Sequence, residues 1–479
     1  MSNRPNILIF VPDGMQAGPA APGHPCVTPN FDRMAERGVT FSRAYTPNPT
    51  CSPARASLMT GLLPHNHGVL QVEHCVDDDQ CALREDRPHW AQRLSDAGYR
   101  TGYFGKWHIE RSHELHRFGW QVHRSMRSGP YQEEVRPYAE AQRDGMDHRV
   151  ERYQEGPEGY APKLHYAVTN TPPEERPVSM PARLARGFLA EALEGDAPWC
   201  CAVSYPDPNE AMICSRATYD MYDVDSIELP ATLGDELEGR PAIYRRSRRI
   251  WEDLTEDQWR EALACYWSRI TEVDGEFGKL LAQIEEAGKL ENTIVIVTTD
   301  HGKYVGEHGM EGHNFGAFES LYNIPMMIRG PGIAAGTRSA ARVGLQDLCP
   351  TIIERAGAEQ IDVPDSRSFA ALLGDPAGAE EDFREGFAEY FGTRFPLMQR
   401  VLWDGSWKFV YNGFDFDELY DLENDPGETC NLAGEPEHRE RVRAMMKKVW
   451  KHVRDTGDAT LLNSQYYSMR FAAVGPDAE

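Results

Sequence analysis

The sequence predicts an α/β protein in which a large mixed, mostly parallel sheet lies between layers of helices, followed by a smaller α+β unit. Two apolar runs, residues 6–11 and 292–299, show no polar alternation, which is typical of strands buried on both faces of a parallel sheet. Helical patterns such as residues 251–287 are interspersed with the strands, as expected for this fold class. Beyond residue 381, short strands separated by turns precede a last long helix.

The first predicted strand ends in a carboxylate. Residues 4–11 form an apolar run that is followed closely by Asp13 and Gly14. Ligands of open parallel sheets gather at the carboxyl ends of the strands, so Asp13 is a candidate ligand for a metal or a substrate. An Asp-Gly pair after a strand also forms turns, and these residues alone leave both interpretations open.

A predicted helix that begins at Cys51 is the most distinctive stretch of the chain. A helix at residues 28–37 and a short strand at residues 39–44 precede it, and Pro53 suits its first turn. The unpaired N–H groups and the dipole of a helix N-terminus favour anions there. Arg55 lies within one turn, where it can reach the same anion or a negative charge that develops on residue 51. The alternative is a buried cysteine followed by a surface arginine.

Two more predicted strands end in polar side chains. Residues 100–104 are followed by Lys106 and His108, which alternate with a tryptophan and so face one side of an extended segment. The second apolar run named above is followed by Asp300 and His301. Hard oxygen ligands of this kind suit calcium, magnesium or manganese better than zinc. The sequence therefore predicts one crevice shared by several strand ends.

The remaining elements complete this outline. We expect residues 111–181 to be a long excursion of loops and short elements. A shift to Gly, Pro, Ala and acidic residues near 374–381 marks a boundary, so the predicted units are 1–375, 376–458 and a tail, 459–479, that either packs on a neighbouring subunit or is disordered. The other expected elements are helices at 86–97, 181–193, 346–357 and 437–454, strands at 199–204, 324–329, 400–403, 407–411 and 417–421, and a polar loop at 64–69.

Composition argues against some classes of partner. The 479 residues carry 50 basic and 75 acidic side chains, and the net charge of −25 argues against nucleic acid or an anionic membrane as partner. No segment approaches the roughly 18 apolar residues of a membrane span, and the first residues show no signal-peptide pattern. We therefore expect a cytoplasmic protein whose ten cysteines are mostly reduced thiols. An anionic substrate then requires a local positive site.

Four separated segments resemble sulfatases of the alkaline-phosphatase superfamily, in the same order along the chain. The resemblance covers nearly the whole sequence, and the Cys-x-Pro-x-Arg signature is its most specific part. Residues 418–428 also resemble the C-terminal subdomain of that family. The four segments are Asp13 after the first strand, residues 51–61, residues 105–108 and residues 298–302.

The resemblance implies a modified cysteine and a metal ion. In sulfatases the signature cysteine is converted after translation to formylglycine, an aldehyde that hydrates to a geminal diol. By that likeness Asp13, Asp300, His301 and the modified Cys51 hold one divalent cation, calcium, with manganese or magnesium as alternatives. The cation would polarise a sulfuryl oxygen of the substrate.

The resemblance also implies a sequence of chemical steps. One hydroxyl of the diol attacks sulfur and expels the alcohol, and loss of a proton from the other hydroxyl then expels sulfate and regenerates the aldehyde. Arg55 and Lys106 would stabilise negative charge on the diol and the sulfuryl oxygens. His108 would orient or deprotonate the diol.

Three positions depart from the family pattern. Many members have a second acidic or amide side chain after the first aspartate, but here Gly14 offers no ligand, and water, a backbone carbonyl or Gln16 would have to replace it. Asn209 replaces a histidine and His313 replaces a lysine, and both family residues contact the transferred group or the leaving oxygen. We therefore expect Asn209, Lys106 and His313 to bind substrate, and His313 to act as the general acid, because imidazole titrates near neutrality.

Two other functions remain open from the sequence. A phosphonate monoester or phosphate diester hydrolase of the same superfamily would use the same nucleophile on another anion, and a catalytically lapsed binding protein would account for the three departures. The expected partners are a small anionic ester and the enzyme that generates formylglycine during maturation. We expect no nucleic acid and no membrane as partner, and a homo-oligomer formed through the C-terminal tail.

Overall fold

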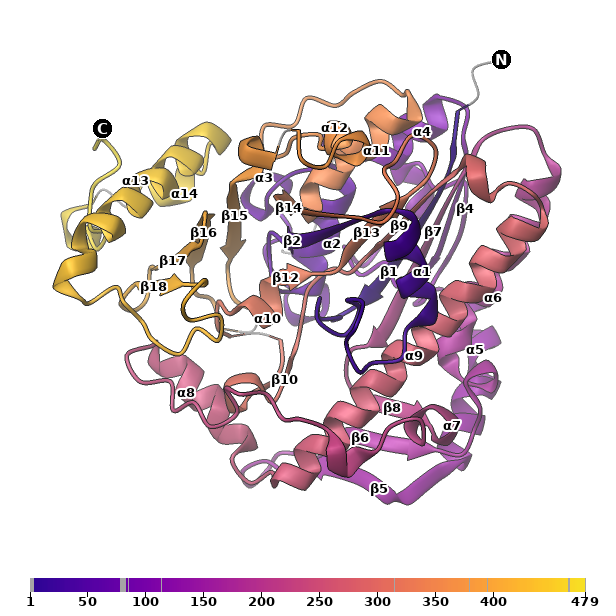
Figure 1. Cartoon of the computed structure of the whole chain (residues 1–479), viewed down its shortest axis with the longest axis horizontal. Helices are drawn as coiled ribbons and strands as arrows, with labels where there is room; N and C mark the ends of the chain where they lie inside the picture. Colours follow the sequence, from indigo (N-terminus) through magenta and orange to yellow (C-terminus); the bar gives the residue numbers. More distant parts are fainter. Residues whose placement is uncertain are drawn as a thin grey trace.

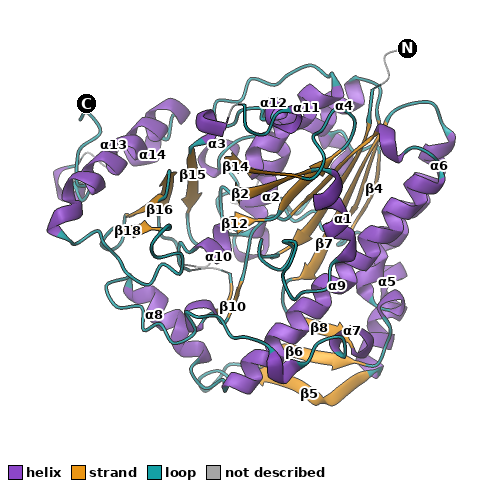
Figure 2. Cartoon of the chain, viewed as in Figure 1, coloured by secondary structure: helices purple, strands orange, loops and turns teal. Residues whose placement is uncertain are grey.

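Nine strands form one mixed sheet at the centre of the larger part of the molecule (Figures 1 and 2). This computed structural model describes residues 4–77, 83–84, 86–112, 114–313, 315–378, 380–393, 395–463 and 466–478. The five strands from β9 to β4 run parallel, whereas β12 and β13 are antiparallel to their neighbours. The spatial order is β12 (Asn323–Ile324), β2 (Val39–Tyr45), β13 (Met326–Arg329), β9 (Thr293–Thr298), β1 (Asn6–Asp13), β7 (Trp199–Pro208), β3 (Arg100–Gly105) and β4 (Val122–Ser125), with β14 (Thr337–Gly344) beside β2.

Helices cover both faces of this sheet, as the sequence predicts. Along β1, Leu8 and Phe10 enter one apolar core, and Ile7 and Ile9 enter the other, because successive side chains of a strand point to opposite faces. The longer helices that contribute to the first core are α1 (Pro29–Arg37), α6 (Met180–Glu194) and α9 (Glu256–Glu286), and those in the second are α2 (Cys51–Thr60), α4 (Trp90–Asp96) and α11 (Leu348–Ala356).

A four-stranded antiparallel sheet forms the smaller unit, which lies at the left of Figure 1. One face of this sheet packs Leu402 and Phe409 against Trp450 of the last long helix, α13. Its other face packs Val401 and Trp403 in a cluster with Tyr45 of the main sheet. The elements are β15 (Glu385–Tyr390), β16 (Gln399–Asp404), β17 (Trp407–Asn412), β18 (Glu418–Asp421) and α13 (Arg439–Thr456).

Residues 111–181 differ from the expectation of loops and short elements. They contain the 16-residue helix α5 (Gly129–Asp144) and the strands β5 (Met146–Gln154) and β6 (Lys163–Thr169). The prediction was wrong because Tyr131 is the one buried side chain of α5, so this helix has almost no apolar periodicity. The strands β5 and β6 form a separate sheet with β8 (Met212–Ser215).

Smaller differences concern the ends of elements. The predicted helix at 86–97 begins only at Trp90, and the predicted polar loop at 64–69 contains a helical turn, α3 (Pro64–His67). The other short elements are α7 (Arg216–Tyr219), α8 (Ala242–Arg248), β10 (Tyr304–Val305), β11 (Glu311–Gly312), α10 (Glu319–Tyr322), α12 (Ala370–Gly374) and α14 (Ala459–Leu462).

The C-terminal tail folds back on the smaller unit of its own chain. Leu461 and Val474 are buried in the core under α13, and the Trp450 indole donates a hydrogen bond of 2.8 Å to the carbonyl of Val474. Tyr467 and Phe471 between them are 86% and 65% exposed. The tail therefore combines two buried anchors with exposed aromatic rings.

The nine cysteines that the structure describes are free thiols, and Cys81 lies outside the described residues. None of the helices within the described residues is both long and apolar enough to span a membrane.

Candidate active site

The carboxyl ends of two neighbouring parallel strands meet at Cys51. Strand β1 ends at Asp13, and it lies beside β9, which is followed by Asp300 and His301. Helix α2 begins at Cys51, as the sequence predicts. The ligand atoms of Asp13, Cys51, Asp300 and His301 all lie within 4.8 Å of one another, and all four residues are buried. The topology thus brings together the four residues that the resemblance assigns to a cation.

Arg55 joins the two carboxylates of this group. Its Nε donates to Asp300 Oδ2 at 2.8 Å, its Nη2 to Asp13 Oδ2 at 2.9 Å, and its Nη1 to the hydroxyl of Ser204 at 2.6 Å. Burial alone would raise the pKa of Asp13, but the charges of Lys106 and Arg55 lower it well below its usual value. Asp13 is therefore a carboxylate in the folded protein.

The two oxygens of Asp13 face different groups. Oδ2 accepts hydrogen bonds from Arg55 and Lys106. Oδ1 lies 3.8 Å from the Cys51 Sγ and 3.9 Å from the His301 Nε2. The first oxygen is thus neutralised by basic side chains, and the second is directed toward the candidate metal ligands.

The His301 ring is oriented to act as a ligand. Its Nδ1 lies 2.7 Å from the carbonyl of Gly302, so Nδ1 carries the proton and Nε2 presents a lone pair 3.1 Å from the Cys51 Sγ. Burial is the largest influence and lowers the pKa of His301, but Asp300 and Cys51 together raise it to a net value above the usual one. Two carboxylates and an imidazole with a fixed tautomer fit a divalent cation.

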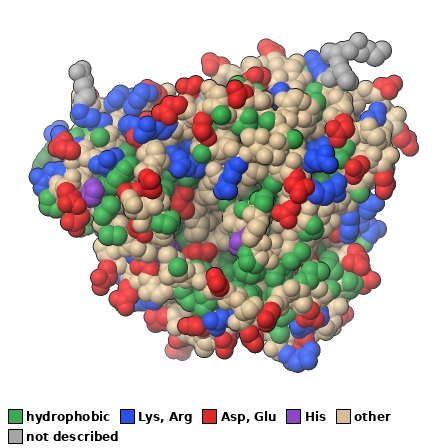
Figure 3. All heavy atoms as spheres, viewed as in Figure 1, with side chains coloured by type: hydrophobic (Ala, Val, Ile, Leu, Met, Phe, Trp, Pro, Cys, Tyr) green, Lys and Arg blue, Asp and Glu red, His purple; other side chains and the backbone are tan. Residues whose placement is uncertain are grey.

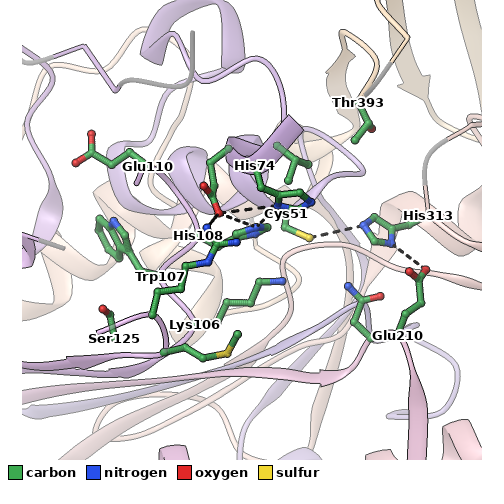
Figure 4. A pocket seen from close by; sticks show the side chains of 15 residues that line it. Cys51, His74, Lys106, Trp107, His108, Glu110, Ser125, Glu210, His313 and Thr393 are labelled. Carbon is green, nitrogen blue, oxygen red and sulfur yellow. Dashed lines mark hydrogen bonds and ion pairs between the residues drawn. The ribbon is translucent and has the colours of Figure 1, made fainter. Parts of the chain in front are cut away.

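His313 lies on the opposite side of Cys51 from His108 (Figure 4). Its ring stacks on His301 at 4.1 Å, and its Nε2 is 3.6 Å from the Cys51 Sγ. Burial lowers the pKa of His313 below the usual value. The half-exposed carboxylate of Glu210 is 3.9 Å from the other ring nitrogen. The structure therefore brings His313 next to the predicted nucleophile.

His108 is held by a buried glutamate that the sequence did not single out. His108 has a φ of 57°, so it leaves the extended conformation from which its side was predicted. Its Nε2 is 3.4 Å from Glu73 Oε1 and 3.2 Å from His74 Nδ1. Burial, and then the charge of Lys106, keep the pKa of His108 well below the usual value. Both Lys106 and His108 nevertheless line the same pocket.

Glu73 is 1% exposed and pairs with basic side chains from two other segments. Its carboxylate pairs with Arg127 and lies 3.4 Å from Arg111 Nε. Its backbone N–H donates to the hydroxyl of Ser52, directly after the nucleophile position, at 3.1 Å. Nothing in the local sequence pattern marks Glu73, because its partners are distant along the chain.

A cavity of about 220 Å³ opens above Cys51. Besides the residues already described, its lining includes Trp107, Ser125 and Thr393, the last from the smaller unit. The Gln16 amide donates to the Lys303 carbonyl and to Glu307, each at 2.6 Å. Gln16 is thus committed elsewhere and does not replace the ligand missing at Gly14.

The fold and this site agree with the comparisons to known proteins. The family model described as Sulfatase matches residues 5–142 and 206–358, and the model described as N-sulphoglucosamine sulphohydrolase, C-terminal, matches residues 306–455. The chain therefore belongs to the sulfatase family, for which the formylglycine mechanism is characteristic. It is a sulfuric ester hydrolase.

Individual relatives are distant but extend over most of the chain. The choline-sulfatase of Rhizobium meliloti (strain 1021) is 28% identical over 91% of this chain and 83% of its own. The N-acetylglucosamine-6-O-sulfatase of Bacteroides thetaiotaomicron is 25% identical, with 93% and 86% covered.

Solved structures show the same fold. The phosphonate monoester hydrolase from Silicibacter pomeroyi has a TM-score of 0.77 at 24% identity, and 96% of this chain and 97% of that chain are covered. A protein solved with its substrate D-glucosamine-2-N,6-O-disulfate has a TM-score of 0.73 at 21% identity, with 95% and 98% covered. The predicted fold class is confirmed.

Proposed function

We propose that this sulfatase hydrolyses sulfate monoesters of small alcohols at the cavity above Cys51, after Cys51 has been converted to formylglycine. The observation that supports this most directly is the convergence of Asp13, Asp300, His301 and Cys51 within 4.8 Å. Cys51 is present here as a thiol, and its Sγ stands in for the diol oxygens of the modified residue. The small volume of the cavity, about 220 Å³, favours a small substrate.

Asp13, Asp300, His301 and residue 51 would hold one divalent cation, which we propose to be calcium because carboxylate oxygens dominate the ligand set. Bound there, the cation would supply Lewis acidity toward a sulfuryl oxygen. Manganese and magnesium are the alternatives, and dialysis against chelator followed by separate addition of the three ions would distinguish them.

Basic side chains would carry the negative charge of the reacting group. The Nζ of Lys106 reaches Asp13 and borders the cavity, so it is placed to donate to a sulfuryl oxygen. Arg55 donates to four acceptors, including both carboxylates, which supports a role in holding Asp13 and Asp300 in place. His108 would orient the diol or accept its proton.

His313 would donate a hydrogen bond or a proton to the leaving alcohol oxygen. Its position 3.6 Å from the Cys51 Sγ, on the side opposite His108, supports this assignment. If His313→Ala slows alkyl sulfates, which need a protonated leaving group, much more than activated aryl sulfates, the assignment holds. Equal losses on both substrates would contradict it.

The substrate is best tested with a panel of esters. We expect sulfate release from 4-nitrophenyl sulfate, choline sulfate and glucosamine 6-sulfate to exceed hydrolysis of a phenyl phosphonate ester and of a phosphate diester. The structural similarity to phosphonate monoester hydrolase makes that activity the second candidate. A faster rate on the phosphonate than on every sulfate ester would favour the second candidate.

Maturation and location belong to the same proposal. A formylglycine-generating enzyme would convert Cys51, which is buried in the folded chain. We place the mature protein in the cytoplasm, and the nine free thiols among the described residues support a reducing compartment.

A further inference from the structure

The amide side chain of Asn209 occupies the space beside Gly14. Gly14 has a φ of 69°, and a Cβ built on it would lie 3.6 Å from the Cβ, the Cγ and the Oδ1 of Asn209. The neighbouring strands explain this proximity, since Asp13 of β1 pairs with Pro208 of β7. Asn209 therefore follows the end of β7 and lies next to Gly14, the position where a ligand is missing.

The Asn209 amide lies on the metal side of Asp13. Its Nδ2 is 2.5 Å from Asp13 Oδ1, the oxygen that also faces Cys51 and His301. The basic side chains Arg55 and Lys106 contact the other oxygen, Oδ2. Asn209 thus contacts the candidate ligand group from the side that the basic residues leave free.

The oxygen of this amide makes no hydrogen bond within the part of the chain that the structure describes. Asn209 Oδ1 is nevertheless buried, and a buried amide oxygen without a partner is costly. A half-turn about the Cβ–Cγ bond exchanges the nitrogen and the oxygen with little change in shape. With a cation among the carboxylates, the oxygen end can face the site and gains the cation as its partner.

We propose that the side-chain oxygen of Asn209 is a metal ligand in this sulfatase and takes the place of the side chain that Gly14 lacks. The inference rests on the proposed cation site. It refines the role of Asn209 expected from sequence, which was contact with the substrate. Gln16, the other amide near Gly14, is excluded because its nitrogen is bound to Lys303 and Glu307.

Isothermal titration calorimetry of calcium binding to the whole chain, without substrate, tests the proposal. The Kd of Asn209→Ala should rise at least about tenfold over wild type, since loss of even an indirect contact costs about 10–100-fold in metal affinity. Gln16→Leu is the matched control, because it removes an amide two residues after Gly14 whose nitrogen contacts Lys303 and Glu307 instead of Asp13, and its Kd should stay unchanged.

A relocation variant makes the test independent of misfolding. Asparagine tolerates the left-handed backbone at position 14, so Gly14→Asn combined with Asn209→Gly should restore most of the calcium affinity. An unchanged Kd in Asn209→Ala, a rise in KM alone, or failure of the double variant to recover would each overturn the proposal. So would a wild-type protein that binds neither calcium, magnesium nor manganese.

This experiment separates two failures. Because binding is measured without substrate, a protein that shows the expected Kd pattern but releases no sulfate would contradict the proposed activity and leave the role of Asn209 supported. Sulfate release with an Asn209-independent Kd would contradict the ligand assignment alone.

Discussion

Individual residues of the site are held by buried ion pairs, in which each charge needs its partner because it is shielded from water. Arg55 is 2% exposed and is shared by Asp13 and Asp300. Removing one partner of a buried ion pair leaves an uncompensated charge, which costs about 3–5 kcal/mol. The arginine therefore serves both the stability of the site and the geometry of its carboxylates.

The first prediction concerns this arginine. Arg55→Lys keeps the charge, but a compact ammonium group on one atom cannot reproduce the planar guanidinium fork that reaches Asp13 and Asp300 at once, so kcat should fall by at least about 100-fold. Arg33→Lys is the control, because Arg33 is half-exposed and contacts Glu285 at 3.5 Å. Steady-state kinetics on an aryl sulfate would measure both, and an Arg55→Lys enzyme as active as the control would contradict the account.

The second prediction concerns Glu73. Glu73→Gln removes the charge that pairs with Arg127 and faces His108, and we expect kcat to fall about 10–100-fold. Glu110→Gln is the matched control, since Glu110 is also buried near the cavity but pairs with Arg117 at 3.0 Å. Equal kcat losses in the two variants would show that the contact with His108 has no special role.

Among individual residues, the sequence predicted those site residues that lie at the ends of recognisable strands and helices. Asp13 ends a strand, Asp300 follows one and Cys51 begins a helix, so their convergence could be expected from the ends of predicted elements. Glu73 and Glu210 could not be predicted in this way. Their importance comes from contacts across more than 30 residues, which leave no local periodicity.

Among the elements, the segment before helix α2 is fixed by the smaller unit. The backbone N–H of Glu389 on β15 donates to the Pro47 carbonyl at 2.8 Å, and the Asn48 amide donates to the Glu389 carbonyl at 2.8 Å. The Asn48 oxygen in turn accepts from the Thr50 N–H at 3.0 Å. The position of the nucleophile helix therefore depends on an antiparallel sheet that follows it by more than 330 residues.

The third prediction concerns the ion pair at this junction. His65 Nδ1 is 2.7 Å from the buried carboxylate of Glu389. Burial lowers the pKa of His65, but the hydrogen bond and charge of Glu389 raise it to about 9. Because the folded pKa is raised, the stabilisation is complete below the unfolded value near 6.5 and is lost as pH rises through 9.

Urea unfolding between pH 6.5 and 9.5 would measure this effect. The free energy of unfolding should fall by up to about 3 kcal/mol over that range in the wild type. In His65→Gln this part of the pH dependence should vanish. A wild type and a variant with parallel pH profiles would show that the pair does not stabilise the junction.

Elements with a strong apolar pattern were predicted well, and those without one were not. Strand β9 is buried at every position and lies within one residue of its predicted ends. Helix α5 has one buried side chain, so composition suggested loops where a 16-residue helix forms.

For the whole molecule, charge is unevenly distributed despite the net −25. Figure 3 shows lysine and arginine side chains gathered over α13, on a face where acidic side chains are otherwise widespread. The basic groups proposed to serve the reaction are instead buried, with Arg55 2% and Lys106 8% exposed. The acidic surface is therefore compatible with an anionic substrate. The buried basic groups form the local positive site that such a substrate requires.

The fourth prediction concerns the tail. Four large apolar side chains between residues 466 and 471 are exposed, and such a concentration marks an interaction surface. We predict self-association through this tail, detectable by light scattering, that is abolished by Tyr467→Ser with Phe471→Ser. Phe416→Ser, an equally exposed but separate site, should have no effect. A wild type that stays monomeric at high concentration would contradict this prediction.

The central claim is that Cys51, as formylglycine, is the nucleophile of a sulfatase whose strand ends supply its metal site and cations. The most direct measurement is the mass of the peptide that contains residue 51, taken from protein that releases sulfate. The account predicts an aldehyde or its hydrate at residue 51, in a fraction that rises with specific activity. Full activity in protein that retains the Cys51 thiol would contradict it.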